Sequence, residues 1–167
     1  PPHDQSSAAS DVYKRQVELT TTIREVVEEC KSRWNPQELN VLLDLPNFEV
    51  PITVDPQKII SVFENLLENA FNHAKELSRI TIRLKIIEKQ TMALCEIEDD
   101  GQTTIAPAEI EKLFERFYRV DKSRSRARGG TGLGLSIVKD IIEAHNGKIM
   151  AKQSKSCLLY TSDAADD

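Results

Sequence analysis

Gly130-Thr131-Gly132-Leu133-Gly134-Leu135 stands between a basic segment and an amphipathic helix pattern, and this stretch indicates the fold more directly than any other. Glycine has no Cβ, so the backbone N–H groups of such a loop can approach an oxyanion closely. The helix that follows adds unpaired N-terminal donors and the positive end of its dipole. Because Gly-x-Gly-x-Gly also occurs in plain turns, the interpretation depends on two further segments, around Asn65 and Asp99.

The overall composition predicts one α+β domain of ordinary size. The 167 residues include 40% hydrophobic side chains, which is enough to bury a core. No apolar run approaches the roughly 20 residues that cross a bilayer, and no signal-peptide pattern opens the chain, so we expect a cytoplasmic domain. Three cysteines at wide spacing fit neither a disulfide framework nor a metal site, and Cys30 and Cys95 are predicted to be buried thiols.

Charge is distributed unevenly along the chain. The net charge of −5 argues against a nucleic-acid partner. A local basic stretch in an acidic protein favours a small polyanion as ligand, although a solvated loop is the alternative for any single residue. The basic residues of this stretch are Arg116, Arg119, Lys122, Arg124, Arg126 and Arg128.

Hydrophobic periodicity predicts helices collected on one face of a mainly antiparallel sheet. Asp55-Pro56 is a natural helix start, because Asp can cap the first turn and proline suits it. Asn146-Gly147 is typical of a helix end. The predicted helices span residues 20–30, 56–74, 108–117 and 133–145, and the predicted strands span residues 17–19, 39–45, 50–54, 80–87, 92–97 and 148–152.

Asparagines gather on one face of the predicted 56–74 helix. Asn65 and Asn69 are four residues apart, and Asn72 and His73 come about one turn later. Amide oxygens are hard neutral ligands that can complete the shell of a Mg²⁺ bound mainly by water and phosphates. A solvated helix face is the alternative, but asparagine is a poor helix former, and its repetition favours a site.

Asp99-Asp100-Gly101 comes where the 92–97 strand must turn. An aspartate at this place can be an ordinary turn residue. A carboxylate held inside a pocket can instead accept a hydrogen bond from the exocyclic amine of adenine, with Gly101 leaving room for the flat base. Residue types alone do not choose between the two.

Four segments, in this order and spacing, resemble the catalytic ATP-binding domain of bacterial sensor histidine kinases. The resemblance covers about residues 17–153 and comes closest to the phosphate-sensing type. It implies a Bergerat fold, which is a two-layer α/β sandwich with a mixed, mostly antiparallel sheet and helices on one face. The segments are Asn65-Leu66-Leu67-Glu68-Asn69-Ala70, Asp99-Asp100-Gly101, Phe114-Glu115-Arg116-Phe117-Tyr118-Arg119-Val120-Asp121 and the glycine stretch quoted above.

The resemblance implies ATP and Mg²⁺ as ligands, held between the asparagine helix and a lid formed by residues 102–129. Asn69 corresponds to the Mg²⁺ ligand and Asn65 to the asparagine that lines the triphosphate, a catalytic position. Asp99 corresponds to the adenine-binding carboxylate. The other implied nucleotide-binding residues are Asn72, His73, Gly101, Phe117, Gly130, Thr131, Gly132, Leu133, Gly134 and Leu135.

The lid carries its own predictions. Phe114 and Phe117 correspond to the aromatic pair that hinges the lid to the core. Arg116 and Arg119 adjoin this hinge, and we expect one of them to close onto the triphosphate during phosphoryl transfer. No apolar anchor occurs in residues 121–129, so this part is expected to be mobile without nucleotide.

The implied enzyme is a protein-histidine kinase of two-component signal transduction. In that family the phosphoacceptor is a histidine followed by an acidic residue on the helix of a separate dimerisation domain, and His3, His73 and His145 offer no such context. We therefore expect a catalytic domain that does not autophosphorylate alone. Its expected partners are the histidine-bearing dimerisation domain of a homodimeric, membrane-anchored bacterial parent kinase and a response regulator.

Two alternatives remain at this point. ATP-hydrolysing relatives with the same fold place a glutamate four residues before the Mg²⁺ asparagine, where this chain has Asn65. An amide cannot accept a proton at neutral pH, so the general base for hydrolysis is lacking. The second alternative is a nucleotide-binding module that has lost catalysis, and Thr103 supports it because the family usually has glycine there.

Both ends of the chain look foreign to the domain. Residues 1–16 and 156–167 resemble translated adapter sequence, and we expect the catalytic domain to occupy residues 17–155. The family domain closes with a final strand after Gln153. Its loss would leave an exposed sheet edge.

Overall fold

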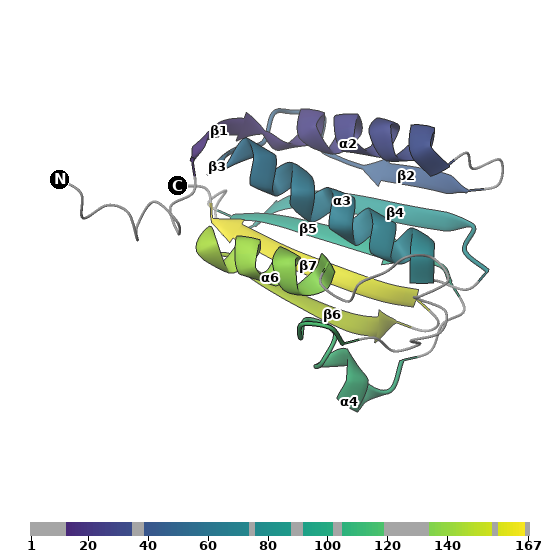
Figure 1. The fold of residues 1–167 in the computed structure, drawn as a ribbon. Helices are drawn as coiled ribbons and strands as arrows, with labels where there is room; N and C mark the ends of the chain where they lie inside the picture. Colours follow the sequence, from purple (N-terminus) through teal and green to yellow (C-terminus); the bar gives the residue numbers. More distant parts are fainter. Residues whose placement is uncertain are drawn as a thin grey trace, which may run out of the picture.

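A five-stranded sheet carries its long helices on one face (Figure 1). The structure, a computed structural model, describes residues 13–34, 39–73, 76–87, 92–101, 105–118, 134–154 and 157–165, with the backbone alone at 73, 154 and 157–165. The strand order is β2-β4-β5-β7-β6, in which β2 and β4 are parallel and the other pairs antiparallel. The strands are β2 (Asn40–Asp44), β4 (Arg79–Ile87), β5 (Met92–Asp99), β6 (Lys148–Ser154) and β7 (Cys157–Ala165).

Three helices lie side by side across this sheet (Figure 1). They are α2 (Leu19–Trp34), α3 (Pro56–His73) and α6 (Gly134–Ala144), and a short α4 (Pro107–Ile110) lies beyond the edge strand β6. A small antiparallel pair, β1 (Arg15–Glu18) with β3 (Pro51–Val54), leads the chain into α2 and α3. The predicted α+β sandwich with a mixed sheet is confirmed.

Alternation of side chains explains which face of the sheet is covered. Ile80, Ile82 and Leu84 of β4 are buried, and so are Ala93, Cys95 and Ile97 of β5, whereas the residues between them are more exposed. Apolar residues at helical spacing on α2, α3 and α6 complete the same core. Cys30 and Cys95 are buried free thiols, as predicted.

Carboxylates cap the first two long helices. Glu18 accepts hydrogen bonds from the backbone N–H groups of Thr20 and Thr21, 3.0 Å each, and from that of Val50 at 2.9 Å. Partial burial opposes the charged form, but these donors and the two threonine hydroxyls outweigh it and lower the pKa of Glu18 to about 2. Asp55 caps α3 through the N–H groups of Gln57 and Lys58.

The sheet includes a strand that the sequence does not predict. β7 lies between β5 and β6 and pairs with both over most of its length (Figure 1). The expectation of an exposed edge after Gln153 is therefore wrong for this structure. No strand is predicted there because residues 156–167 resemble translated adapter sequence and are set apart from the domain. The foreign origin of residues 1–16 and 156–167 stays a prediction.

The predicted 108–117 helix is also largely wrong. Helical geometry ends at Ile110, and the chain continues in tight turns to residue 118. The N–H groups of Lys112, Leu113 and Glu115 each bond to the carbonyl three residues earlier. The apolar spacing of Ile110, Leu113 and Phe114 suits such turns as well as an α-helix, so periodicity could not separate them.

In the described ranges, no helix is long and apolar enough to cross a membrane.

Candidate functional site

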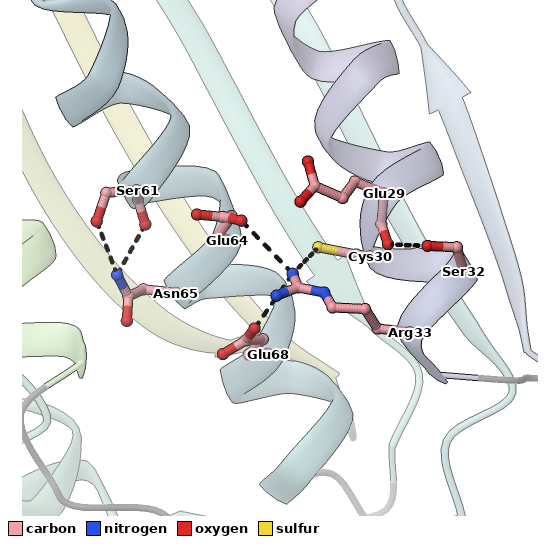
Figure 2. A network of polar contacts seen from close by, with 8 residues as sticks. All are labelled: Glu29, Cys30, Ser32, Arg33, Ser61, Glu64, Asn65 and Glu68. Carbon is pink, nitrogen blue, oxygen red and sulfur yellow. Dashed lines mark hydrogen bonds and ion pairs between the residues drawn. The ribbon is translucent and has the colours of Figure 1, made fainter.

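Asn65 points away from α2 and toward the start of α6 (Figure 2). Its Nδ2 donates to the carbonyl oxygen of Ser61 at 2.8 Å and to the Ser61 hydroxyl at 3.2 Å. These bonds fix the amide with Oδ1 facing Gly134, where an added Cβ would lie 3.1 Å from that oxygen. This would be a tighter contact than a Cβ usually makes, so glycine at the end of the loop lets the backbone approach the asparagine closely.

The other candidates on α3 lie on or near the same face. Asn69 stands one turn after Asn65, and Asn72 is half-buried. His73 is the last residue of α3, and its side chain is not described. Their placement agrees with the predicted asparagine face, and their roles in binding nucleotide and Mg²⁺ stay predictions.

Asp99 is a carboxylate inside the molecule. It ends β5 on the face that the helices cover and is only 4% exposed. Its Oδ1 accepts a hydrogen bond from the Gly101 N–H at 3.0 Å. Burial raises the pKa of Asp99 to about 6, the Gly101 bond opposes the rise, and Asp100 and Glu98 add to it. A buried carboxylate with so little compensation is typical of a binding site.

The neighbouring Asp100 has a different role. Its carboxylate accepts hydrogen bonds from the N–H groups of Ser78 and Arg79, at 2.9 and 2.8 Å, and from the Ser78 hydroxyl. Burial opposes ionisation of Asp100, but these donors together lower its pKa below the ordinary value. Asp100 therefore ties the end of β5 to the start of β4 and holds Asp99 in place.

The turn segment 105–118 leaves the sheet beside β6. The Ile105 N–H donates to Gln153 Oε1 at 3.1 Å, and Ile105 and Leu113 are buried. Phe114 packs against the core, in agreement with an anchoring role. Phe117 does not, because it is 68% exposed, so the expected pair of aromatic anchors has only one member in the core of this structure. Its φ of 64° is in the left-handed region, which is rare for an aromatic residue.

Arg116 contacts α6 in this structure. Its Nη2 lies 3.3 Å from Asp140 Oδ2, and both side chains are mostly exposed. Arg119, Gly130, Thr131, Gly132 and Leu133 lie outside the described residues, as does the 121–129 stretch expected to be mobile. Leu135 is buried in the core, and its part in nucleotide binding stays a prediction.

A polar network joins the opposite side of α3 to α2 (Figure 2). Arg33 Nη2 lies 3.5 Å from Glu64 Oε2 and 3.3 Å from Glu68 Oε1, and it donates to Cys30 Sγ at 3.3 Å. Burial raises the pKa of the Cys30 thiol, so it stays protonated at neutral pH. Next to this network the rings of Trp34 and Phe71 stack with centroids 4.6 Å apart.

Three supporting residues were missed in the sequence. Ser61 orients Asn65, Asp100 fixes the turn after Asp99, and Gln153 holds the base of the turn segment. The sequence shows a serine one helical turn before Asn65. Whether the two side chains bond to each other depends on the rotamer of Asn65, which the sequence does not show. Contacts such as Ile105 with Gln153 span 48 residues and leave no local pattern.

A family profile described as "Histidine kinase-, DNA gyrase B-, and HSP90-like ATPase" matches residues 54–161. The chain belongs to this ATPase family. The matched range runs from the end of β3 into β7 and includes Asn65, Asp99 and Gly134. Within the described ranges, no group of three or more histidine, cysteine or acidic side chains could hold a metal ion.

The chain is similar in sequence to sensor histidine kinases. Sensor histidine kinase WalK of Bacillus subtilis is 36% identical over 115 residues, which are 69% of this chain and 19% of the relative. Among solved structures, the catalytic domain of histidine kinase ThkA has a TM-score of 0.79 at 23% identity, covering 93% of this chain and 97% of that one. Full-length ShkA in complex with AMPPNP also has a TM-score of 0.79, at 19% identity, covering 94% and 32%.

The chain spans about a fifth to a third of the length of the curated relatives it matches. Membership of the ATPase family and the predicted fold are confirmed. The resemblance to the phosphate-sensing type in particular stays a prediction.

Proposed function

We propose that this domain binds Mg²⁺-ATP and donates the γ-phosphate to a histidine on a dimerisation domain of its parent kinase. The observation that carries the proposal is the orientation of Asn65, whose amide oxygen faces the end of the glycine loop. The glutamate that serves as general base in hydrolysing relatives is replaced there by a group that cannot take a proton. Transfer to an external acceptor is thus favoured over hydrolysis.

The residues present fit the ligand by their chemistry. Asn69 would hold Mg²⁺, since its amide oxygen suits a hard cation and phosphates and water supply the other ligands. When bound, Mg²⁺ neutralises charge on the phosphate oxygens. Asn65 would contact the triphosphate, and Asp99 would accept a hydrogen bond from the adenine amine. Support also comes from ShkA, a fold neighbour solved with AMPPNP.

The proposed transfer needs a second domain. A histidine nitrogen attacks the γ-phosphorus, the new P–N bond forms, and the bond between that phosphorus and the β–γ bridging oxygen breaks, so ADP leaves. Arg116 or Arg119 would neutralise charge in the transition state. Arg116 would first have to leave Asp140, an exchange that two exposed side chains can make at little cost.

Partners of the parent protein follow from the same proposal. The phosphohistidine would pass its phosphoryl group to a response regulator, and ThkA, another fold neighbour, has been solved in complex with response regulator TrrA. We further propose that the parent is a homodimer anchored in the cell membrane.

A domain exchange tests the proposal. Residues 17–165 replace the corresponding domain of Bacillus WalK, and the chimera is incubated with γ-labelled ATP and Mg²⁺. We expect acid-labile label on the WalK histidine, no label on residues 17–165 alone, and little phosphate release from either. Steady phosphate release by the isolated domain, lost on Asn65→Ala, would show an ATPase instead. Absence of AMPPNP binding by calorimetry would refute the nucleotide site itself.

A further inference from the structure

Two contacts join α3 and α6, one toward each end of the stretch over which they pack. At one end the Asn65 amide oxygen meets Gly134. At the other end the backbone N–H of Asp55 donates to Nε2 of His145 at 3.0 Å. Figure 1 shows the two helices next to each other over the sheet, so these contacts fix one helix against the other.

His145 makes both of its hydrogen bonds within the protein. It is 8% exposed and follows the last turn of α6, where its Nδ1 lies 2.8 Å from the carbonyl oxygen of Ile141. An amide N–H can only donate and a carbonyl can only accept, so Nε2 accepts from Asp55 and Nδ1 donates to Ile141. Neither nitrogen is available to receive a phosphoryl group in this arrangement.

Asp55 is equally well fixed. Its Oδ1 accepts hydrogen bonds from the N–H groups of Gln57 and Lys58, and its carbonyl oxygen accepts from that of Ile59 at 3.0 Å. The residue that His145 holds is thus the N-terminal cap of α3. Any shift of His145 moves this cap, and α3 moves with it.

The two contacts lie a similar distance apart on both helices, so a displacement of the helices at one contact reaches the other. Ten residues separate Asp55 from Asn65 and eleven separate Gly134 from His145, which corresponds to roughly 15 Å along each helix. Between the two contacts, apolar residues of both helices lie in the core, including Ile59, Val62, Val138 and Ile142. Close-packed helices transmit a displacement along their axes rather than absorb it.

We propose that His145 is a positioning residue of the nucleotide site, which sets the approach of α6 to α3 and thereby the gap between Asn65 and the end of the glycine loop. The proposal rests on the proposed function for its effect on nucleotide binding. A histidine that only stabilises the fold would lower the melting temperature and leave the nucleotide affinity of the folded protein unchanged.

Two variants of nearly equal length separate these roles. His145→Gln keeps an acceptor for the Asp55 N–H and a donor for Ile141, whereas His145→Met keeps the volume and loses both. Ile82→Val in β4 is the control, because it removes a buried methylene of a residue that belongs to neither contact, and it is expected to lower stability alone. Each protein is measured at a temperature at which its unfolding curve shows it folded.

We expect His145→Met to weaken AMPPNP binding about fivefold or more, the effect of one neutral hydrogen bond, and His145→Gln to restore most of it. In the nucleotide-free protein, the ¹H–¹⁵N signals of the Asn65 side chain and the Gly134 amide should shift in His145→Met and return in His145→Gln. Ile82→Val should bind as the parent does.

The proposal is overturned if folded His145→Met binds AMPPNP like the parent and leaves both signals unmoved, or if Ile82→Val loses as much affinity. If the parent protein binds no nucleotide, the proposed function fails, and the two amide signals alone decide the role of His145. If His145→Met does not fold, His145→Asn takes its place. The asparagine side chain is one methylene shorter than that of glutamine, so its amide does not reach the Asp55 N–H in the same way and should shift the same two signals.

Discussion

Asp99 is a titratable carboxyl in the interior at the end of β5. Its ionisation lowers the free energy of unfolding of the nucleotide-free protein. Its pKa of about 6 exceeds the ordinary value of 3.8, so the native state holds more protons than the unfolded chain between these values. The free energy of unfolding should therefore fall as pH rises from about 4 to 6, by up to about 3 kcal/mol, and stay low above that window. Thermal unfolding without nucleotide across this range measures the slope.

The same carboxylate should bind the base. At neutral pH we expect Asp99→Asn to weaken ATP binding by ~1.5–3 kcal/mol, the size of a hydrogen bond to a charged group, and GTP to bind poorly because it carries an oxygen where adenine has its amine. ATP affinity of the parent should fall as pH drops through about 6, since a protonated Asp99 no longer accepts the same bond.

Asp100→Asn is the matched control for Asp99. The pKa of Asp100 is lowered, so its contribution to stability is present above its unfolded value and is lost only as pH falls below about 4. Asp99→Asn should abolish the slope between pH 4 and 6, while Asp100→Asn should keep most of it, because burial is the main cause of the raised pKa of Asp99 and the Asp100 charge only adds to it. Equal affinity for ATP and GTP, or an unchanged slope in Asp99→Asn, contradicts the role given to Asp99.

Residue chemistry was readable from the sequence where it depended on local spacing. Asn65 and Asn69 share a face because four residues make about one helical turn, and Asp99 ends a strand because a turn sequence follows. The orientation of the Asn65 amide was not readable, since it depends on a rotamer and on Gly134, which is far away in the sequence. His145 was considered only as a phosphoacceptor, and its bond to Asp55 across 90 residues leaves no local signal.

At the scale of elements, two kinds of contact attach α2 to the back of α3. The ion pairs of Arg33 with Glu64 and Glu68 have side chains 31–45% exposed, and each such pair contributes less than about 1 kcal/mol. The parallel Trp34–Phe71 stack excludes water from two rings and adds about 0.5–1.5 kcal/mol beyond the area it buries. The stack should therefore determine how firmly the end of α2 is held.

We expect Phe71→Ala to lower the free energy of unfolding by about 1.5–3 kcal/mol and Arg33→Gln to lower it by less than about 1 kcal/mol. Trp34 is the single tryptophan of the chain, so its fluorescence reports the junction directly during urea unfolding. High salt should weaken only the contribution of Arg33. A larger loss in Arg33→Gln than in Phe71→Ala would mean that the ion pairs dominate.

Elements were predicted well where the hydrophobic period was sustained. The pattern of α3 extends over 18 residues and predicted that helix to within one residue at its C-terminal end. The 105–118 segment failed because two apolar spacings fit both a helix and successive turns, and because Phe117 adopts a left-handed φ that its residue type disfavours.

Over the whole molecule, β7 determines whether the sheet is continuous. It lies between β5 and β6 and is hydrogen-bonded to both, so it joins them into one sheet. β6 in turn borders α4 and the turn segment that carries Arg116. The sequence predicts residues 156–167 to be foreign to the domain, because they resemble translated adapter sequence and stand where the family domain has its Gly-rich turn and final strand. In the structure, residues 157–165 nevertheless pair with both flanking strands.

Truncation tests this dependence. We expect a chain that ends at residue 155 to leave the edges of β5 and β6 unpaired, to unfold at a lower temperature and in a broader transition, and to lose hydrogen-exchange protection in β5. A chain that ends at Ala165 is the control and should match the full chain, because it keeps every β7 pair. Equal melting temperatures and equal protection of β5 in both truncated chains would show that the rest of the sheet holds together without β7. In that case, the last twelve residues would behave as an appendage, as their sequence suggested, and Asp99 at the end of β5 would keep its position through Asp100 and the pairing with β4 alone.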